Sequence, residues 1–82
     1  MLQLKILGTG CPKCEKLASA VTDVAHDLNL ECDIEKVTDI NEIIKYGVMM
    51  TPALVVDGQV KVVGNVPSSD ELKSLLTAAA SA

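Results

Sequence analysis

Two cysteines separated by two residues, Cys11-Pro12-Lys13-Cys14, are the clearest chemical feature of the sequence. At this spacing the second sulfur can fold back against the first, so the pair could exchange disulfides or bind a soft metal ion. The leading residues lack the continuous apolar stretch of a signal peptide, and we therefore expect a cytoplasmic protein. In that reducing compartment a close cysteine pair is more often catalytic or metal-binding than structural.

The motif stands where a predicted strand gives way to a predicted helix. Apolar residues alternate with Gln3 and Lys5 over residues 2–7, which predicts a strand with one buried face and one partly wet face. Gly8 ends this pattern, and Pro12 suits the first turn of a helix because its missing N–H is no loss there. The expected strand and helix therefore place the cysteines at a helix N-terminus.

This placement predicts different environments for the two sulfurs. The apolar residues of the expected helix lie on one stripe: Leu17, Val21, Val24 and Leu28. Cys14 continues that stripe and should be buried, whereas Cys11 lies at the cap and should be open to solvent. Unpaired N–H groups and the helix dipole stabilise a thiolate at the cap, and Lys13 adds positive charge. We expect a lowered pKa for Cys11, with Pro12 and Lys13 as tuning residues.

The rest of the chain predicts three more strands and two more helices. Residues 31–37 indicate a short strand, and Asp39 resembles the cap of a short helix that ends at Gly47. The apolar face of this helix is formed by Ile40, Ile43 and Ile44. Two further apolar runs flank Asp57-Gly58, which predicts an antiparallel hairpin.

The last predicted element is a helix capped by Ser68 and Glu71, with fraying from Ala80 onward. Its apolar positions are Leu72, Leu75, Leu76 and Ala79. The order β-α-β-α-β-β-α predicts an α/β fold, a four-stranded mixed sheet with three helices, in a single domain over residues 1–82. The first two strands should be parallel neighbours, with two helices on one sheet face and one on the other.

Composition narrows the classes of function. The net charge is −4, and the basic residues are scattered lysines that form no stripe for phosphates, so we expect no nucleic-acid partner. No apolar run is long enough to span a bilayer, and we expect no membrane partner. We expect a small aliphatic core, because the chain has 82 residues, no Trp, no Phe and one Tyr, and we expect a monomer.

Together, the order of elements, the Cys11-Pro12-Lys13-Cys14 motif and Thr51-Pro52 before a strand resemble a minimal member of the thioredoxin and glutaredoxin family, specifically the small glutaredoxin-like thioredoxins. The resemblance implies a minimal thioredoxin-like fold and a thiol-disulfide oxidoreductase without a cofactor. It implies a cis peptide bond before Pro52, substrate binding by Thr51 and Pro52, and catalysis by Cys11 and Cys14. The partners implied are disulfide-containing protein substrates and a reductant of the thioredoxin-reductase type, with glutathione left open.

Two other interpretations stay open. A Cys-x-x-Cys carrier of soft metal ions has a similar loop-to-helix motif, but a closed zinc site needs two more ligands and only His26 and Cys32 are candidates. The second interpretation is a binding module whose disulfide is only structural. A disulfide that closes a four-residue loop would stabilise the fold little, because it hardly restrains the unfolded chain. We expect Cys32 to be a small buried hydrophobe, His26 a solvated residue and Met49-Met50 part of a recognition groove.

Overall fold

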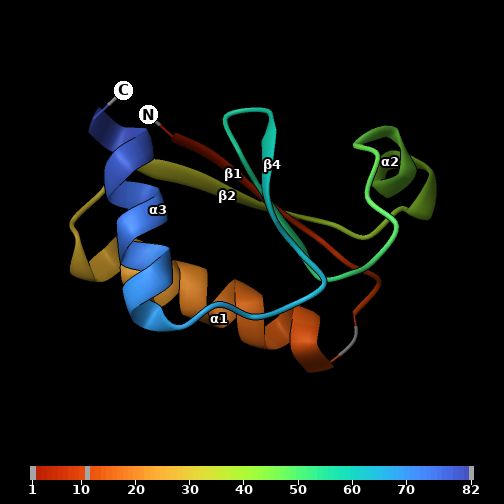
Figure 1. Cartoon of the computed structure of the whole chain (residues 1–82), viewed down its shortest axis with the longest axis horizontal. Helices are drawn as coiled ribbons and strands as arrows, with labels where there is room; N and C mark the ends of the chain where they lie inside the picture. Colours follow the sequence, from red (N-terminus) through yellow and green to blue (C-terminus); the bar gives the residue numbers. More distant parts are fainter. Residues whose placement is uncertain (1, 11, 82) are drawn as a thin grey trace.

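The computed structural model describes residues 2–10 and 12–81, and its elements follow the predicted order β-α-β-α-β-β-α (Figure 1). The elements are β1 (Leu2–Leu7), α1 (Pro12–Asp27), β2 (Cys32–Val37), α2 (Ile40–Lys45), β3 (Ala53–Val56), β4 (Gln59–Val63) and α3 (Ser69–Ser81). None of the helices in these described ranges is long and apolar enough to cross a membrane. The predicted fold class is confirmed.

The four strands form one mixed sheet in the order β2-β1-β3-β4. β1 runs parallel to β2, with Leu4 opposite Ile34, as a crossover through α1 requires. β1 is antiparallel to β3, and β3 is antiparallel to β4. The two central strands therefore border both parts of the predicted site. β1 leads into the cysteine motif, and β3 begins directly after Thr51-Pro52.

The Asp57-Gly58 turn between β3 and β4 confirms the predicted hairpin. Both residues have positive φ, +49° at Asp57 and +84° at Gly58, as a type I′ turn requires. The Asp57 backbone N–H donates to the Gln3 carbonyl at 2.8 Å, and the Gln3 N–H donates to the Asp57 carboxylate at 2.8 Å. This pair of hydrogen bonds fixes the hairpin against the start of β1.

The larger hydrophobic core lies between the sheet and the pair of helices α1 and α3, which lie together on one side of the sheet in Figure 1. Its buried members are Leu2, Leu4, Ile6, Leu17, Ala18, Val21, Val24, Leu54, Val56, Val62, Leu72 and Leu76. They include Leu17, Val21 and Val24 of the stripe predicted for α1 and Leu72 and Leu76 of the one predicted for α3, whereas Leu75 and Ala79 are only partly buried against this core. α1 ends at Asp27, one residue before the predicted Leu28, which packs half-buried at the core edge.

The smaller core lies on the opposite face, under α2, and consists of Leu7, Ile43, Val48, Ala53 and Val55. The predicted apolar face of α2 is only partly correct, because Ile43 is buried whereas Ile40 and Ile44 are 60% and 62% exposed. The six residues of α2 make fewer than two helical turns, so only a narrow side of this helix can be buried. Of the three isoleucines, the short helix thus turns only Ile43 toward the sheet.

Both predicted caps form. The Asp39 carboxylate accepts from the Asn41 N–H at 2.9 Å, and the Ser68 hydroxyl accepts from the Glu71 N–H at 3.3 Å. The last helix does not fray where predicted, because α3 continues through Ala80 to Ser81. Its alanine-rich last turn follows Leu76, which anchors the helix in the larger core.

Candidate functional site

The predicted site begins in the short connection between β1 and α1. Gly8, Thr9 and Gly10 follow the strand, and Gly10 has a φ of +93°, which turns the chain toward the helix. Pro12 opens α1 as predicted, and its side chain and that of Lys13 are exposed. Cys11 lies outside the described residues, so its exposure and its lowered pKa stay predictions.

Cys14 lies in the first turn of α1 and is buried, with 5% of its surface exposed, as its position on the apolar stripe predicted. Leu17 and Val21 follow it along the buried side of the helix. The sulfur of Cys14 takes part in a disulfide. The structure thus places one member of a disulfide at the start of a helix, shielded from solvent.

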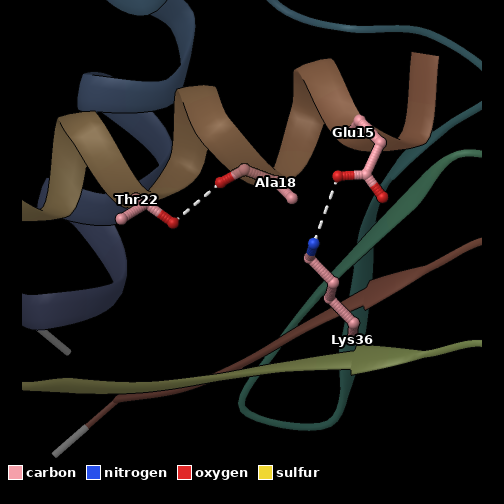
Figure 2. Close-up of polar contacts among 4 residues, drawn as sticks. All are labelled: Glu15, Ala18, Thr22 and Lys36. Atoms are coloured by element: carbon pink, nitrogen blue, oxygen red, sulfur yellow. Dashed lines mark hydrogen bonds and ion pairs between the residues drawn. The ribbon is translucent and has the colours of Figure 1, made fainter. Parts of the chain in front are cut away.

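The polar groups beside the motif lie on the surface. Glu15 forms an ion pair with Lys36 of β2 at 3.2 Å, and Figure 2 shows the Lys36 ammonium directed at the Glu15 carboxylate. One turn further, the Thr22 hydroxyl donates to the Ala18 carbonyl at 2.8 Å (Figure 2). Because Lys36 partly neutralises Glu15, this carboxylate opposes the positive charge of the nearby Lys13 only weakly.

Thr51 and Pro52 lie where the resemblance implies, directly before β3. The Thr51-Pro52 peptide bond is cis, which confirms that prediction. Pro52 is buried, and its carbonyl accepts from the Gly64 N–H at 2.7 Å, which holds the chain before β3 against the end of β4. Thr51 is exposed.

A groove of about 450 Å³ lies between the connection from β1 to α1, helix α2 and the loop before β3. It is lined by Thr9, Ile40, Ile43, Ile44, Gly47, Val48, Met49 and Thr51. Thr51 is a predicted substrate-binding residue, and Thr9 belongs to the connection between β1 and α1, so these two parts of the chain meet in one groove. Its exposed isoleucines and Met49, which is 95% exposed, make its rim apolar.

Gly8 is a residue whose role the sequence did not reveal. A Cβ atom built at this position would overlap the Cys14 sulfur and would lie 2.9 Å from the Cys14 Cβ. In the sequence Gly8 is simply the residue that ends the first strand, and no pattern there signals a contact with a cysteine six positions later. The three-dimensional approach of strand and helix alone identifies it.

The remaining cysteine and the other candidate metal ligands do not form a site in the described part of the chain. Cys32 is a free, half-buried cysteine that packs against the larger core, so it is less buried than predicted because β2 is an edge strand. His26 is exposed, as predicted. No group of three or more His, Cys, Asp or Glu side chains within residues 2–10 and 12–81 could hold a metal ion.

Lys5 and Tyr46 form a polar pair on the α2 side of the sheet. The Lys5 ammonium lies 5.9 Å from the centroid of the Tyr46 ring. A hydrogen bond to the Tyr46 side chain, followed by the charges of Tyr46 and Glu35, raises the pKa of Lys5 above the ordinary lysine value. Lys5 is therefore a half-buried, positively charged residue with a specific partner, which agrees with the partly wet face predicted for this strand.

Comparison with known proteins agrees with this geometry. Residues 2–77 match the family of the thioredoxin domain. A thioredoxin from Methanothermobacter thermautotrophicus is 32% identical over 77 residues, which cover 94% of this chain and 100% of the relative. A thioredoxin from Methanocaldococcus jannaschii is 38% identical over 76 residues, covering 93% and 87%.

Among solved structures, a mutant thioredoxin from Halobacterium salinarum is similar with a TM-score of 0.71, covering 94% of this chain and 73% of that one. At 24% identity this likeness concerns the fold alone. The fold and the position of Cys14 define a small thioredoxin-fold protein of the redox class. The chain belongs to the thioredoxin domain family, and its function is of the thioredoxin redox type.

Proposed function

We propose that the protein is a thiol-disulfide oxidoreductase that reduces protein disulfides with Cys11 as the nucleophile and Cys14 as the resolving thiol. The observation that carries the proposal is the buried, disulfide-bonded Cys14 in the first turn of α1. A sulfur shielded in this way is a poor first nucleophile for a bulky substrate. It is well placed to attack a mixed disulfide formed beside it.

In the first step the Cys11 thiolate attacks one sulfur of a substrate disulfide, and the second substrate sulfur leaves as a thiolate. In the second step Cys14, deprotonated, attacks the Cys11 sulfur of the mixed disulfide and releases the remaining substrate thiolate. The S–S bond of the substrate is broken and a Cys11–Cys14 bond is formed. Two electrons pass from the protein to the substrate, whose thiolates take up protons from water.

Pro12 and Lys13 tune the first step. Pro12 begins α1 without an N–H that would need a partner, and the following N–H groups stay available to a thiolate at the cap. Lys13 is exposed, so its charge acts through solvent and its contribution is small. The helix N-terminus supplies the larger part of the stabilisation.

Thr51 and Pro52 receive the substrate. Thr51 is exposed in the groove that is also lined by Thr9, so a polypeptide bound there would lie next to the connection between β1 and α1. The apolar rim formed by Ile40, Ile44 and Met49 favours a substrate segment with aliphatic side chains next to its disulfide. A protein substrate fits this surface better than a small charged thiol does.

The reaction needs no metal or organic cofactor, and a reductase of the thioredoxin-reductase type would return the disulfide to the dithiol. We propose that the protein works as a single-domain monomer in the cytoplasm. Its net charge of −4 and scattered lysines favour protein partners over nucleic acid.

Reduction of insulin with dithiothreitol as the electron source tests the proposal. The protein should accelerate insulin reduction, and Cys14→Ser should abolish turnover while accumulating a mixed disulfide through Cys11. Cys32→Ser is the matched control and should retain the wild-type rate, because Cys32 is free and lies on an edge strand. Tight binding of Cu(I) or Zn²⁺ by the dithiol without insulin reduction would instead favour the metal carrier.

A further inference from the structure

We propose that Gly8 is the positioning residue for the Cys14 sulfur, and that its missing side chain sets how readily the disulfide is reduced. The inference rests on the proposed function, because it concerns the same pair of cysteines. Its first support is the close approach described above, in which any Cβ at position 8 would overlap the Cys14 sulfur. Real side chains do not tolerate such an overlap, so one of the two residues would have to move.

The backbone conformation does not explain why position 8 is a glycine. Four of the five glycines, Gly10, Gly47, Gly58 and Gly64, have positive φ values that favour glycine on conformational grounds. Gly8 is not in that group, and an L-residue could adopt its φ. The glycine is therefore required by the space that the sulfur occupies and not by the course of the chain.

The backbone of Gly8 is held in place and cannot retreat from a side chain. Its N–H donates to the Val37 carbonyl at 3.0 Å, which extends the hydrogen bonding between β1 and β2 by one residue. Leu7, the preceding residue, is completely buried in the smaller core. A methyl group at position 8 would thus act on Cys14 and not on the strand.

Cys14 is held from the other side by its helix. Leu17 and Val21, which follow it along α1, are completely buried in the larger core, so the helix cannot shift away without disturbing that packing. What can move is the Cys14 side chain, by rotation about χ1. A disulfide removes that freedom, whereas a thiol keeps it.

A methyl group at position 8 should therefore disfavour the disulfide relative to the dithiol. In reduction by dithiothreitol, the S–S bond of Cys14 breaks, two protein thiols form, and the reagent gives up two electrons and closes into its cyclic disulfide. In Gly8→Ala the reduced Cys14 side chain can rotate away from the added methyl group, whereas the disulfide-bonded one cannot. The equilibrium constant for reduction should therefore shift about fivefold toward the dithiol, which is the size of a modest overpacking effect.

The experiment is equilibration of Gly8→Ala with mixtures of reduced and oxidised dithiothreitol, followed by alkylation of free thiols and mass determination. Ser19→Ala is the control on the exposed side of α1 and should stay within threefold of the wild type, because Ser19 is exposed and lies outside the groove. A shift of threefold or more toward the dithiol in Gly8→Ala supports the proposal. A smaller shift, or a shift toward the disulfide, overturns it.

If Gly8→Ala does not fold, the double variant Gly8→Ala/Cys14→Gly decides. Glycine at position 14 removes both the sulfur and the Cβ that the added methyl group would overlap, so the folded state should be recovered. A double variant that stays unfolded while Cys14→Gly alone folds would overturn the proposal. Neither measurement uses a protein substrate, so failure to reduce insulin would count against the proposed function and not against the role of Gly8.

Discussion

The two faces of the sheet differ in what they do with apolar side chains. On the α1 and α3 side, twelve buried residues from both helices and all but one of the strands form a continuous core. On the α2 side, the buried cluster has five residues, and Ile40 and Ile44 of α2 itself stay exposed. The packing that stabilises the fold is therefore concentrated under α1 and α3, whereas the α2 side keeps the exposed apolar side chains to which we assign substrate recognition.

The candidate site lies where these two regions meet. Cys14 belongs to the α1 side by its burial, whereas the groove next to Thr9 and Thr51 belongs to the α2 side. The packing around the Cys14 sulfur and the apolar groove, where we propose that substrates bind, are therefore supplied by different parts of the same small fold. Substitutions on the two faces should accordingly change different measurable quantities.

The largest expected effect is loss of stability from the larger core. Leu72→Ala should lower the free energy of unfolding by about 3 kcal/mol, because it removes a completely buried side chain between α3 and the sheet. Ile44→Ala, on the exposed side of α2, should cost less than about 0.5 kcal/mol. Urea unfolding followed by far-ultraviolet circular dichroism measures both, and similar losses in the two variants would contradict the division between the faces.

A smaller effect, on activity and not on stability, is expected at the groove. The double variant Ile40→Ser/Ile44→Ser should lower kcat/KM for insulin reduction about fivefold, because a seated substrate would lose apolar contacts. Reduction of the protein's own disulfide by dithiothreitol serves as the control and should keep its rate, since the small reagent does not need the groove. Unchanged insulin reduction would show that substrates approach from elsewhere.

The caps of α2 and α3 should differ in how much local order they maintain. Asp39→Ala should cost about 1 kcal/mol, and amide exchange should rise mainly within α2, which has six residues and one buried side chain. Ser68→Ala removes the equivalent bond of α3, but the buried Leu72 and Leu76 should keep exchange low there. Native-state hydrogen exchange by mass spectrometry checks this, and equal increases in the two helices would be the contrary result.

The smallest expected effect concerns Lys5. Tyr46 raises the pKa of Lys5 in the folded protein above the value of about 10.5 for an ordinary lysine. The pair therefore stabilises the fold fully below pH 10.5, and this contribution is lost as the pH rises through the pKa of Lys5 in the folded protein. Stability should thus not vary with pH through Lys5 near neutrality. Tyr46→Phe should lower the pKa of Lys5 toward its ordinary value, as measured by NMR titration of the side chain.

Substitution of Lys5 also tests whether this half-buried residue of β1 takes part in the chemistry of the cysteines. The pH profile of disulfide reduction should show one ionisation, and Lys5→Met should leave it unchanged, because residues 2–7 contain no carboxylate to couple with the cysteines. Two coupled ionisations that become one in Lys5→Met would make Lys5 a functional partner of the site.

The strongly periodic parts of the fold could be predicted from the sequence. The stripe of Leu17, Val21 and Val24 established both α1 and the burial of Cys14, because the spacing of apolar residues in a helix is set by its geometry. Asp57-Gly58 established the hairpin, since few residue pairs adopt two successive positive φ values. In these cases local chemistry and the final packing agree.

Features that depend on how separate elements meet could not be predicted. Nothing local distinguishes Ile43 from Ile40 or Ile44, because the side of a short helix that faces the sheet is decided by its connections. The contact between Gly8 and Cys14 depends on the angle at which α1 leaves β1. Likewise the groove exists only because Thr9 and Thr51, far apart in the chain, are brought to one end of the sheet.

The single tyrosine gives the protein an unusual spectroscopic property. The sequence contains no Trp and no Phe, and Tyr46 lies half-buried at the end of α2 next to Lys5. Tyrosine fluorescence therefore reports on the α2 side of the sheet and responds little to the packing of α1 and α3. A fluorescence transition that precedes the loss of helical circular dichroism would thus record the opening of one face of the protein while the other is still intact.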